Sequence, residues 1–284
     1  MNRTVENKVL RDFILRSLAE DIGSGDHTSL ACIPAESNGK ARLLVKENGV
    51  LAGSRVAAEI FRIADKDLIF ESFISDGSLI SKGDVVFHIS GSVRSILKTE
   101  RLILNIMQRM SGIATSTYQY AARLKGLKTR ILDTRKTTPG MRFLEKEAVR
   151  IGGGFNHRMG LYDMILLKDN HIDYAGGIEK AIRRTRDYLE THDLNLKIEI
   201  EARNLSDVKK ILETGGVDRI MLDNFSTGDT RTAVELIAGR LETESSGGIT
   251  LETIRDYAEC GVDFISAGAL THHIKSLDMS LKAF

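Results

Sequence analysis

The chain has few of the features that mark membrane or nucleic-acid-binding proteins. Its 284 residues contain no run of about 18 apolar residues, the length that a membrane-spanning helix needs. Lysine and arginine number 40 against 39 aspartate and glutamate residues, so the net charge of +1 gives no basic field over the whole molecule. Nucleic-acid binders usually have such a field. We therefore expect neither a membrane nor a nucleic acid as a partner.

Cysteine is also scarce, and an apolar leader is missing. The two cysteines, Cys32 and Cys260, lie far apart among apolar and small residues, which favours reduced, buried thiols over a disulfide or metal site. The first residues, Met1 to Glu6, lack the apolar core of a secretory signal. These absences predict a cytoplasmic protein. The hydrophobic content of 42% is sufficient for a full core in one large or two moderate domains.

The first part of the chain predicts a small α+β domain. Residues 9–18 have the apolar spacing of an amphipathic helix, and short β-like runs follow, separated by Asn-Gly, Asp-Gly, Lys-Gly and Ser-Gly turn signals. The β-like runs are at 41–45, 68–70 and 85–89. A long helix begins near Ser95, and we expect it to join two domains. We expect an N-terminal α+β sandwich domain over 1–110, onto which 275–284 could pack back.

Beyond residue 110 the pattern alternates between strands and helices, which indicates a parallel sheet covered by helices. A polar residue follows nearly every strand. A βα barrel collects such residues around one mouth, whereas an open sheet concentrates its ligand at one switch point. A complete eight-unit barrel needs about 250 residues, so we expect 111–274 to form an incomplete βα barrel. The predicted strands are 130–132, 164–167, 197–200, 219–222, 240–242 and 264–266, and the predicted helices are 177–190, 206–214, 230–238 and 250–260.

Cations and glycines crowd into the segment from Asp133 to His171. Its polar clusters, 133–140 and 168–171, each follow an apolar run. We therefore expect each cluster to lie in a loop directly after a strand. So many like charges on one rim cost stability unless a ligand neutralises them. The segment therefore predicts a site for a multiply charged anion.

Seven segments, in order along almost the whole chain, resemble the quinolinate phosphoribosyltransferase family, also called carboxylating nicotinate-nucleotide pyrophosphorylases. Together they are far more specific than any one of them, since a lone Thr-Arg-Lys could arise by chance. The segments are 20–26, 100–105, 133–142, 153–161, 222–224, 244–248 and 268–272.

The resemblance implies a reaction that joins quinolinate to phosphoribosyl pyrophosphate with Mg²⁺ and yields nicotinate mononucleotide, pyrophosphate and CO₂. Quinolinate carries two carboxylates, which planar guanidinium groups hold bidentately. Lys136 adds compact charge for the same pocket and for the pyrophosphate. By the resemblance, Arg101 reaches the site of a neighbouring subunit, which implies a homodimer or a higher oligomer. The residues implied for quinolinate are Arg101, Arg135, His157, Arg158 and Lys168.

The departing pyrophosphate leaves positive character on the ribose, which calls for carboxylates that stabilise it and hold Mg²⁺ or ribose hydroxyls. Glu201 and Asp223, at successive strand ends, are the candidates for both roles. Lys136 and Lys168 complete the implied catalytic set. The 5′-phosphate is expected after the last strands, where barrels commonly bind phosphate. The residues implied for phosphoribosyl pyrophosphate are Lys136, Glu201, Asp223, Ser246, Gly247, Gly268 and His272.

Some charged residues have a simpler interpretation. Arg142, Lys146 and Arg150 recur at a spacing of four, which predicts a solvated helix face, with a position for Arg142 at the border of the pocket as the alternative. Glu199 lies two residues before Glu201 and so shares its face of a strand. We expect Glu199 to support the site and not to bind substrate.

Three other functions remain open. A homologue associated with molybdenum transport has the same fold, although the intact segment from Asp133 to Arg142 argues against it. A barrel lyase would use Lys168 as a Schiff-base amine, which borohydride trapping would detect. An anion-binding scaffold would bind quinolinate without releasing pyrophosphate.

Overall fold

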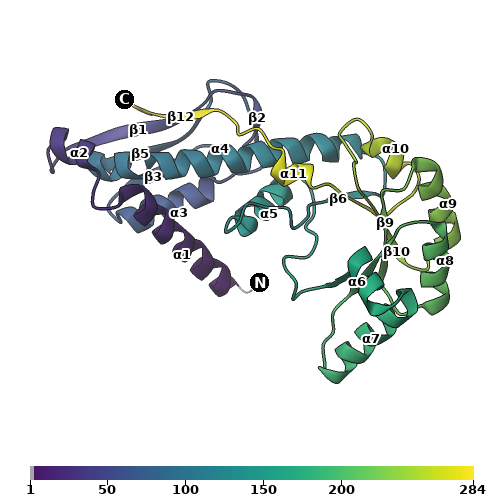
Figure 1. Cartoon of the computed structure of the whole chain (residues 1–284). Coiled ribbons are helices and arrows are strands. Elements are labelled where there is room, and N and C mark those ends of the chain that lie inside the picture. The colour runs from purple at the N-terminus through teal and green to yellow at the C-terminus, as the bar shows by residue number, and fades with distance from the viewer. Residues whose placement is uncertain (1–2) are drawn as a thin grey trace. The chain divides into compact units, whose positions relative to one another are not determined.

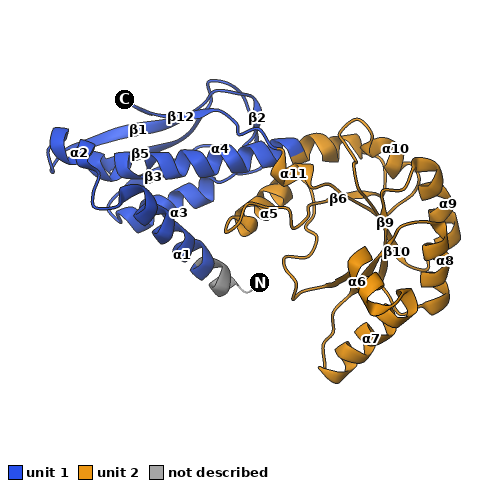
Figure 2. Cartoon of the chain, viewed as in Figure 1, with its two compact units in different colours: residues 1–116, 274–284 blue, residues 117–273 orange. Residues whose placement is uncertain are grey.

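The computed structural model describes residues 3–284, which form two compact units (Figure 2). Unit 1 contains the residues up to 116 together with 274–284, and unit 2 contains residues 117–273. The division falls inside one long helix, α4 (Val93–Arg123), whereas the sequence predicts a boundary at 110. Within 3–284, no helix has both the length and the apolar character needed to cross a membrane.

Unit 1 contains a four-stranded antiparallel sheet with helices. The strand order is β12-β1-β5-β3, and a small second sheet pairs β2 with β4. Besides α4, the elements are α1 (Arg3–Ile22), α2 (His27–Cys32), β1 (Asn38–Val45), β2 (Gly49–Val50), α3 (Ser54–Ala64), β3 (Ile69–Ser72), β4 (Leu79–Ile80), β5 (Val85–Ser92) and β12 (Met279–Ala283).

Alternating burial in β1 and helical spacing in α3 explain the core of unit 1. Leu43 and Val45 of β1 are fully buried, as expected for a strand with one face on the core. Phe61 of α3 contacts Phe87 of β5 edge to face, with 5.9 Å between ring centroids. The C-terminal strand β12 returns to unit 1 and pairs with β1 from Met279 to Ala283. Cys32 is exposed, so the expectation that both thiols are buried is wrong for this residue and holds for Cys260.

Unit 2 is built from six parallel strands and the helices between them. α7, α8 and α9 follow one another along the outside of the sheet (Figure 1). The strands are β6 (Arg130–Leu132), β7 (Ile165–Leu167), β8 (Ile198–Ala202), β9 (Arg219–Asp223), β10 (Glu242–Ser246) and β11 (Phe264–Ser266). The helices are α5 (Arg142–Ile151), α6 (Asp169–Ala175), α7 (Ile178–Thr191), α8 (Leu205–Thr214), α9 (Thr227–Ile237), α10 (Ile254–Ala258) and α11 (Ala269–His272), besides the end of α4.

The strand order confirms the predicted incomplete barrel. Each strand from β7 to β11 pairs with the next one along the chain, and β11 pairs with β6, so the last strand meets the first. In a closed barrel β6 would also pair with β7, and this is the one strand junction missing among the described residues. The fold therefore combines an α+β unit with an incomplete βα barrel.

One predicted strand is displaced. We expect a strand at 240–242, but β10 runs from Glu242 to Ser246 and includes Ser245. The sequence Glu-Thr-Glu-Ser-Ser shows no apolar alternation. Glu244 and Ser245 are nevertheless buried, and Glu244 pairs with Arg219, so polar contacts take the place of apolar ones.

Candidate functional site

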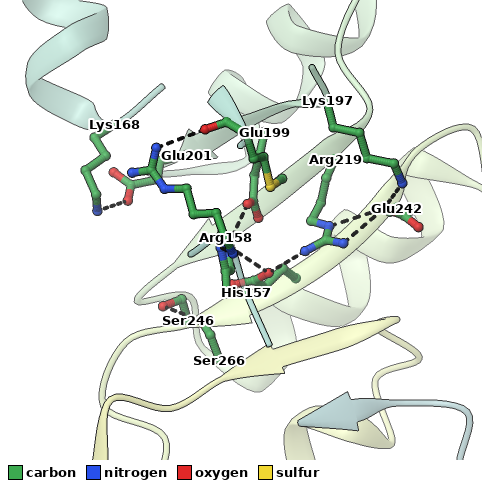
Figure 3. Close-up of polar contacts among 12 residues, drawn as sticks. His157, Arg158, Lys168, Lys197, Glu199, Glu201, Arg219, Glu242, Ser246 and Ser266 are labelled. Carbon is green, nitrogen blue, oxygen red and sulfur yellow. Dashed lines mark hydrogen bonds and ion pairs between the residues drawn. The ribbon is translucent and has the colours of Figure 1, made fainter. Parts of the chain in front are cut away.

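The carboxyl ends of β7 and β8 bring Lys168 and Glu201 together. Lys168 follows β7 directly, and its Nζ lies 2.7 Å from Glu201 Oε1 (Figure 3). Glu201 Oε2 also accepts a hydrogen bond from the backbone N–H of Asp169 at 3.0 Å. His171 Nδ1 accepts from the backbone N–H of Lys168 at 3.0 Å, which fixes the start of α6. The Glu201 side chain is nearly buried, whereas Lys168 is 47% exposed and accessible to a ligand.

Asp223 ends the neighbouring strand β9 and lies within the electric field of Glu201. The pKa of Asp223 is raised by burial first and then by the negative charge of Glu201. Asn224 Nδ2 donates to Asp223 Oδ2 at 2.9 Å. Two carboxylates that repel one another at adjacent strand ends favour a bound cation.

The loops after β9 and β10 approach so closely that Gly247 is required. Its φ is +97°, and a Cβ at this position would lie 2.1 Å from Asn224 Oδ1. Just before this loop, Ser246 Oγ accepts a hydrogen bond from Ser266 Oγ of β11 at 3.1 Å. The ends of three strands are therefore held together on one side of the rim.

Lys136, Gly268 and His272 form a second cluster. A Cβ on Gly268 would lie 2.8 Å from His272 Nε2 and 3.0 Å from Lys136 Cδ. Thr271 Oγ1 donates to the backbone carbonyl of Lys136 at 2.7 Å, which joins the loop after β6 to α11. Burial lowers the pKa of His272, and the charges of His273 and Lys136 lower it further.

Arg135 and Arg158 are close enough to repel one another. The pKa of Arg158 is lowered by burial first and then by the positive charge of Arg135. Arg158 Nη1 donates to the backbone carbonyl of Met164 at 3.2 Å, and Arg135 Nε is buried without a hydrogen-bond partner. A buried donor and two neighbouring guanidinium groups are suited to a carboxylate ligand.

The His157 side chain turns into the barrel and is only 6% exposed. Nδ1 accepts a hydrogen bond from the backbone N–H of Arg158 at 2.7 Å. Nε2 lies 2.8 Å from Glu199 Oε2 and 3.6 Å from Glu244 Oε2. Glu244 in turn binds Arg219 Nη1 at 3.0 Å. The sequence indicates Glu199 as a supporting residue but assigns no individual role to Glu244 or Arg219. For Glu244, the alternation of Glu242 and Glu244 was the available signal.

The expectation that Lys146 lies on a solvated face is wrong. Its side chain is fully buried and forms an ion pair with Asp133, while Nζ also donates to the carbonyl of His157 at 2.9 Å. Burial raises the pKa of Asp133 to about 6 and lowers the pKa of Lys146. Arg142 also turns inward, and its Nε donates to Thr137 Oγ1 at 3.0 Å, which leaves Arg150 as the exposed member of the three. Asp133 and Lys146 therefore anchor the loop that carries His157.

Arg101 lies on α4 in unit 1 and is exposed. The other predicted site residues belong to unit 2, on the loops and strand ends described above.

Comparison with known proteins matches both parts of the chain to one family. Residues 26–111 match the N-terminal domain of quinolinate phosphoribosyl transferase, and residues 113–282 match its C-terminal domain. A chloroplastic nicotinate-nucleotide pyrophosphorylase [carboxylating] from Arabidopsis thaliana is 46% identical over 96% of this chain and 82% of its own. A probable nicotinate-nucleotide pyrophosphorylase [carboxylating] from Bacillus subtilis is 41% identical over 99% of this chain and 94% of its own.

A solved structure has the same fold over nearly the whole chain. The nicotinate-nucleotide pyrophosphorylase from Francisella tularensis superposes with a TM-score of 0.91 at 40% identity, covering 98% of this chain and 97% of its own. Both domains of one family are thus matched in order, at 40% to 46% identity to these relatives. The chain belongs to the quinolinate phosphoribosyl transferase family.

Proposed function

We propose that the chain transfers the phosphoribosyl group of phosphoribosyl pyrophosphate to quinolinate with decarboxylation, giving nicotinate mononucleotide, pyrophosphate and CO₂ in NAD biosynthesis. The observation that carries this proposal is the joint placement of a guanidinium pair and a carboxylate pair at the strand ends of one barrel. Family membership supports the same reaction.

Arg135 and Arg158 hold the two quinolinate carboxylates. Their mutual repulsion, which helps to lower the pKa of Arg158, is relieved when a dianion binds. Lys168 lies at the same rim and adds a third positive charge. Its ion pair with Glu201 is typical of a binding site and does not resemble the apolar pocket of a Schiff-base lysine.

Phosphoribosyl pyrophosphate occupies the loops after the later strands. Gly247 and Gly268 allow close approach of the backbone to a phosphate, and Ser246 and His272 supply side-chain contacts. Lys136, which lies beside Gly268, supplies charge to the pyrophosphate. These groups fix the leaving group while the anomeric carbon faces the pyridine nitrogen.

Glu201 and Asp223 stabilise the positive charge that develops on the ribose. The same two residues would hold Mg²⁺, because their hard carboxylate oxygens suit this ion. The pKa of Asp223 is raised by burial first and then by the charge of Glu201, and a cation would relieve both. When bound, Mg²⁺ neutralises charge on the pyrophosphate and so favours its departure. Loss of the 2-carboxylate follows, because the alkylated, cationic ring nitrogen stabilises the carbanion that forms.

The active form is a homodimer or a larger oligomer in which Arg101 of one subunit contributes to the quinolinate pocket of another. This proposal is supported by the exposure of Arg101 on α4. The enzyme works in the cytoplasm, which is supported by an exposed free thiol at Cys32, since thiols of this kind persist in reducing compartments.

The direct test is to incubate the purified chain with quinolinate, phosphoribosyl pyrophosphate and Mg²⁺ and to measure nicotinate mononucleotide, pyrophosphate and CO₂. We expect all three in equal amounts, with loss of activity on chelation of Mg²⁺ and recovery on its return. Arg135→Ala is expected to raise KM for quinolinate by about a hundredfold, the scale of a lost charged contact. Binding of quinolinate without release of pyrophosphate would instead identify an anion-binding protein.

A further inference from the structure

We propose that Arg142 is a positioning residue for quinolinate. Its guanidinium joins the loop that carries Arg135 to the loop that carries Arg158, and so sets the distance between the two groups that hold the carboxylates. This inference rests on the proposed function. It assigns a role to an arginine that the proposed reaction does not use.

The guanidinium of Arg142 contacts both loops. Nε donates to Thr137 Oγ1 at 3.0 Å, and Nη2 donates to the backbone carbonyl of Arg135 at 3.5 Å. Nη1 donates to the backbone carbonyl of Met159 at 3.1 Å. Met159 follows Arg158 directly in the chain. One planar group therefore holds the backbone next to each of the two proposed carboxylate-binding arginines.

The stability of α5 does not explain an arginine at this position. Arg142 is the first residue of the helix, and its side chain is half-buried. The backbone N–H groups at the start of a helix give this end a partial positive charge, which disfavours a cation and favours aspartate or glutamate. The oxygen acceptors in the two loops do explain an arginine here, because they use its N–H groups in several directions.

A second residue of α5 joins the same two loops nearer to their start. Lys146 forms an ion pair with Asp133, and its Nζ donates to the backbone carbonyl of His157 at 2.9 Å. Arg142 makes its contacts two residues farther along each loop, at Arg135 and Met159. Two points of attachment fix the relative orientation of two chain segments, whereas one point leaves them free to turn.

Repulsion between Arg135 and Arg158 tends to separate the loops. The pKa of Arg158 is lowered by burial first and then by the positive charge of Arg135. Arg142 resists this separation by binding carbonyl and hydroxyl oxygens, which carry no net charge. A carboxylate in its place would neutralise the arginines. The bridge thus preserves the positive charge that a dianion requires.

The phosphoribosyl pyrophosphate side of the site has an anchor of its own. The backbone carbonyl of Lys136 accepts a hydrogen bond from Thr271 Oγ1 at 2.7 Å, which attaches this part of the loop to α11. We therefore expect loss of the Arg142 bridge to disturb quinolinate binding more than phosphoribosyl pyrophosphate binding. The two Michaelis constants separate these effects.

The distance between the two arginines matters for a ligand with two carboxylates. Quinolinate needs both guanidinium groups at a fixed separation, since bidentate contacts tolerate little displacement. Nicotinate has one carboxylate and can bind to a single guanidinium. The bridge made by Arg142 therefore favours pyridine dicarboxylates over monocarboxylates.

The test is a double-mutant cycle on Arg142→Met and Thr137→Val in the whole chain. KM is measured for quinolinate and for phosphoribosyl pyrophosphate, and nicotinate is used as a competing inhibitor. We expect Arg142→Met to raise KM for quinolinate about tenfold, the scale of one lost charged hydrogen bond. KM for phosphoribosyl pyrophosphate and the inhibition constant of nicotinate should each change by less than about twofold.

Thr137→Val removes the hydroxyl to which Arg142 Nε donates, and it is expected to raise KM for quinolinate about threefold. The double variant should match Arg142→Met, because both changes break the same bridge. Thr137→Val also carries the test if Arg142→Met does not fold, since it removes only a hydroxyl. Arg142→Lys keeps the charge but lacks the planar fork, so its KM should lie between those of the unmodified chain and Arg142→Met.

Arg150→Met is the matched control for Arg142→Met. Arg150 lies on the same helix, but its side chain is exposed and forms an ion pair with Glu147 at 3.3 Å. It should leave KM for quinolinate unchanged.

The inference fails if Arg142→Met leaves KM for quinolinate unchanged. It also fails if Thr137→Val has no effect or if the two effects add fully, because the bridge would then not carry the effect of Arg142. An equal loss of affinity for nicotinate and quinolinate would contradict a role in setting the distance. Failure of the proposed function has a different signature, since the unmodified chain would then release no pyrophosphate with quinolinate.

Discussion

Charged side chains inside the barrel are paired with partners that lie far away in the sequence. Lys146 meets Asp133, which is 13 positions away, and Arg219 meets Glu244, which is 25 positions away. Strands of a parallel sheet are usually apolar on both faces. This barrel instead buries charge, which is tolerated only where each group has a partner.

Lys146→Met tests the structural role of the buried ion pair. Methionine keeps the length of the side chain but leaves Asp133 without its main partner. We expect the free energy of unfolding to fall by about 3 kcal/mol, the usual cost of removing one member of a buried pair. Chemical denaturation measures this loss.

Arg150→Met is the matched control for this stability test. Arg150 lies on the same helix and forms an exposed ion pair with Glu147, at 3.3 Å. Exposed pairs contribute little, so a change below about 0.5 kcal/mol is expected. Equal losses in the two variants would refute the structural role assigned to Lys146.

At the scale of elements, the site depends on how closely neighbouring βα loops approach. Asn224, after β9, has a φ of +56°, and Gly247, after β10, has a φ of +97°. The close approach of Asn224 leaves no room for a side chain at Gly247. These strained backbone conformations persist only when the surrounding strands hold both loops in place.

Gly247→Ala tests this approach. A Cβ would lie 2.1 Å from Asn224 Oδ1, so the loop after β10 must move away from the proposed phosphate position. We expect KM for phosphoribosyl pyrophosphate to rise at least about tenfold, with little change in KM for quinolinate. Steady-state kinetics with each substrate varied in turn separates the two.

Gly239→Ala provides the control, since Gly239 also has a positive φ, +72°, but open space where the Cβ would lie. It carries the backbone strain without the clash. If both variants bind phosphoribosyl pyrophosphate normally, the loop after β10 does not form the phosphate site.

At the scale of the whole molecule, the proposed reaction depends on a residue that a second subunit contributes. Glu201 belongs to unit 2, whereas Arg101 belongs to unit 1. If Arg101 serves another subunit, a single chain does not form a complete site. Assembly and activity are then coupled.

Mixing two inactive variants tests this coupling. Arg101→Ala and Glu201→Ala are each expected to be inactive alone. A mixed dimer contains one site in which both residues are intact, so random exchange of subunits should restore about one quarter of the wild-type activity. Activity is measured after unfolding and refolding the variants together and, as the control, separately. No recovery in refolded mixtures would place Arg101 in the site of its own subunit or outside the site.

The amino-acid sequence by itself determined the fold class and the family. Alternation of apolar strands with amphipathic helices depends on local spacing, and local spacing is preserved in the fold. The motifs around Arg135, Arg158 and Asp223 are contiguous, so they are visible in a linear chain. The roles of the individual site residues stay predictions until substrates are tested.

Only the tertiary structure decided which charged residues lie inside the barrel. Lys146 has the helical spacing of a solvated face, yet it is buried because it forms an ion pair with Asp133, which lies after β6. β10 has no apolar pattern, yet it is a buried strand because Arg219 pairs with its glutamates. Pairing across strands depends on which residues the barrel brings face to face. The spacing of residues along the chain therefore does not predict the partner of a buried charge.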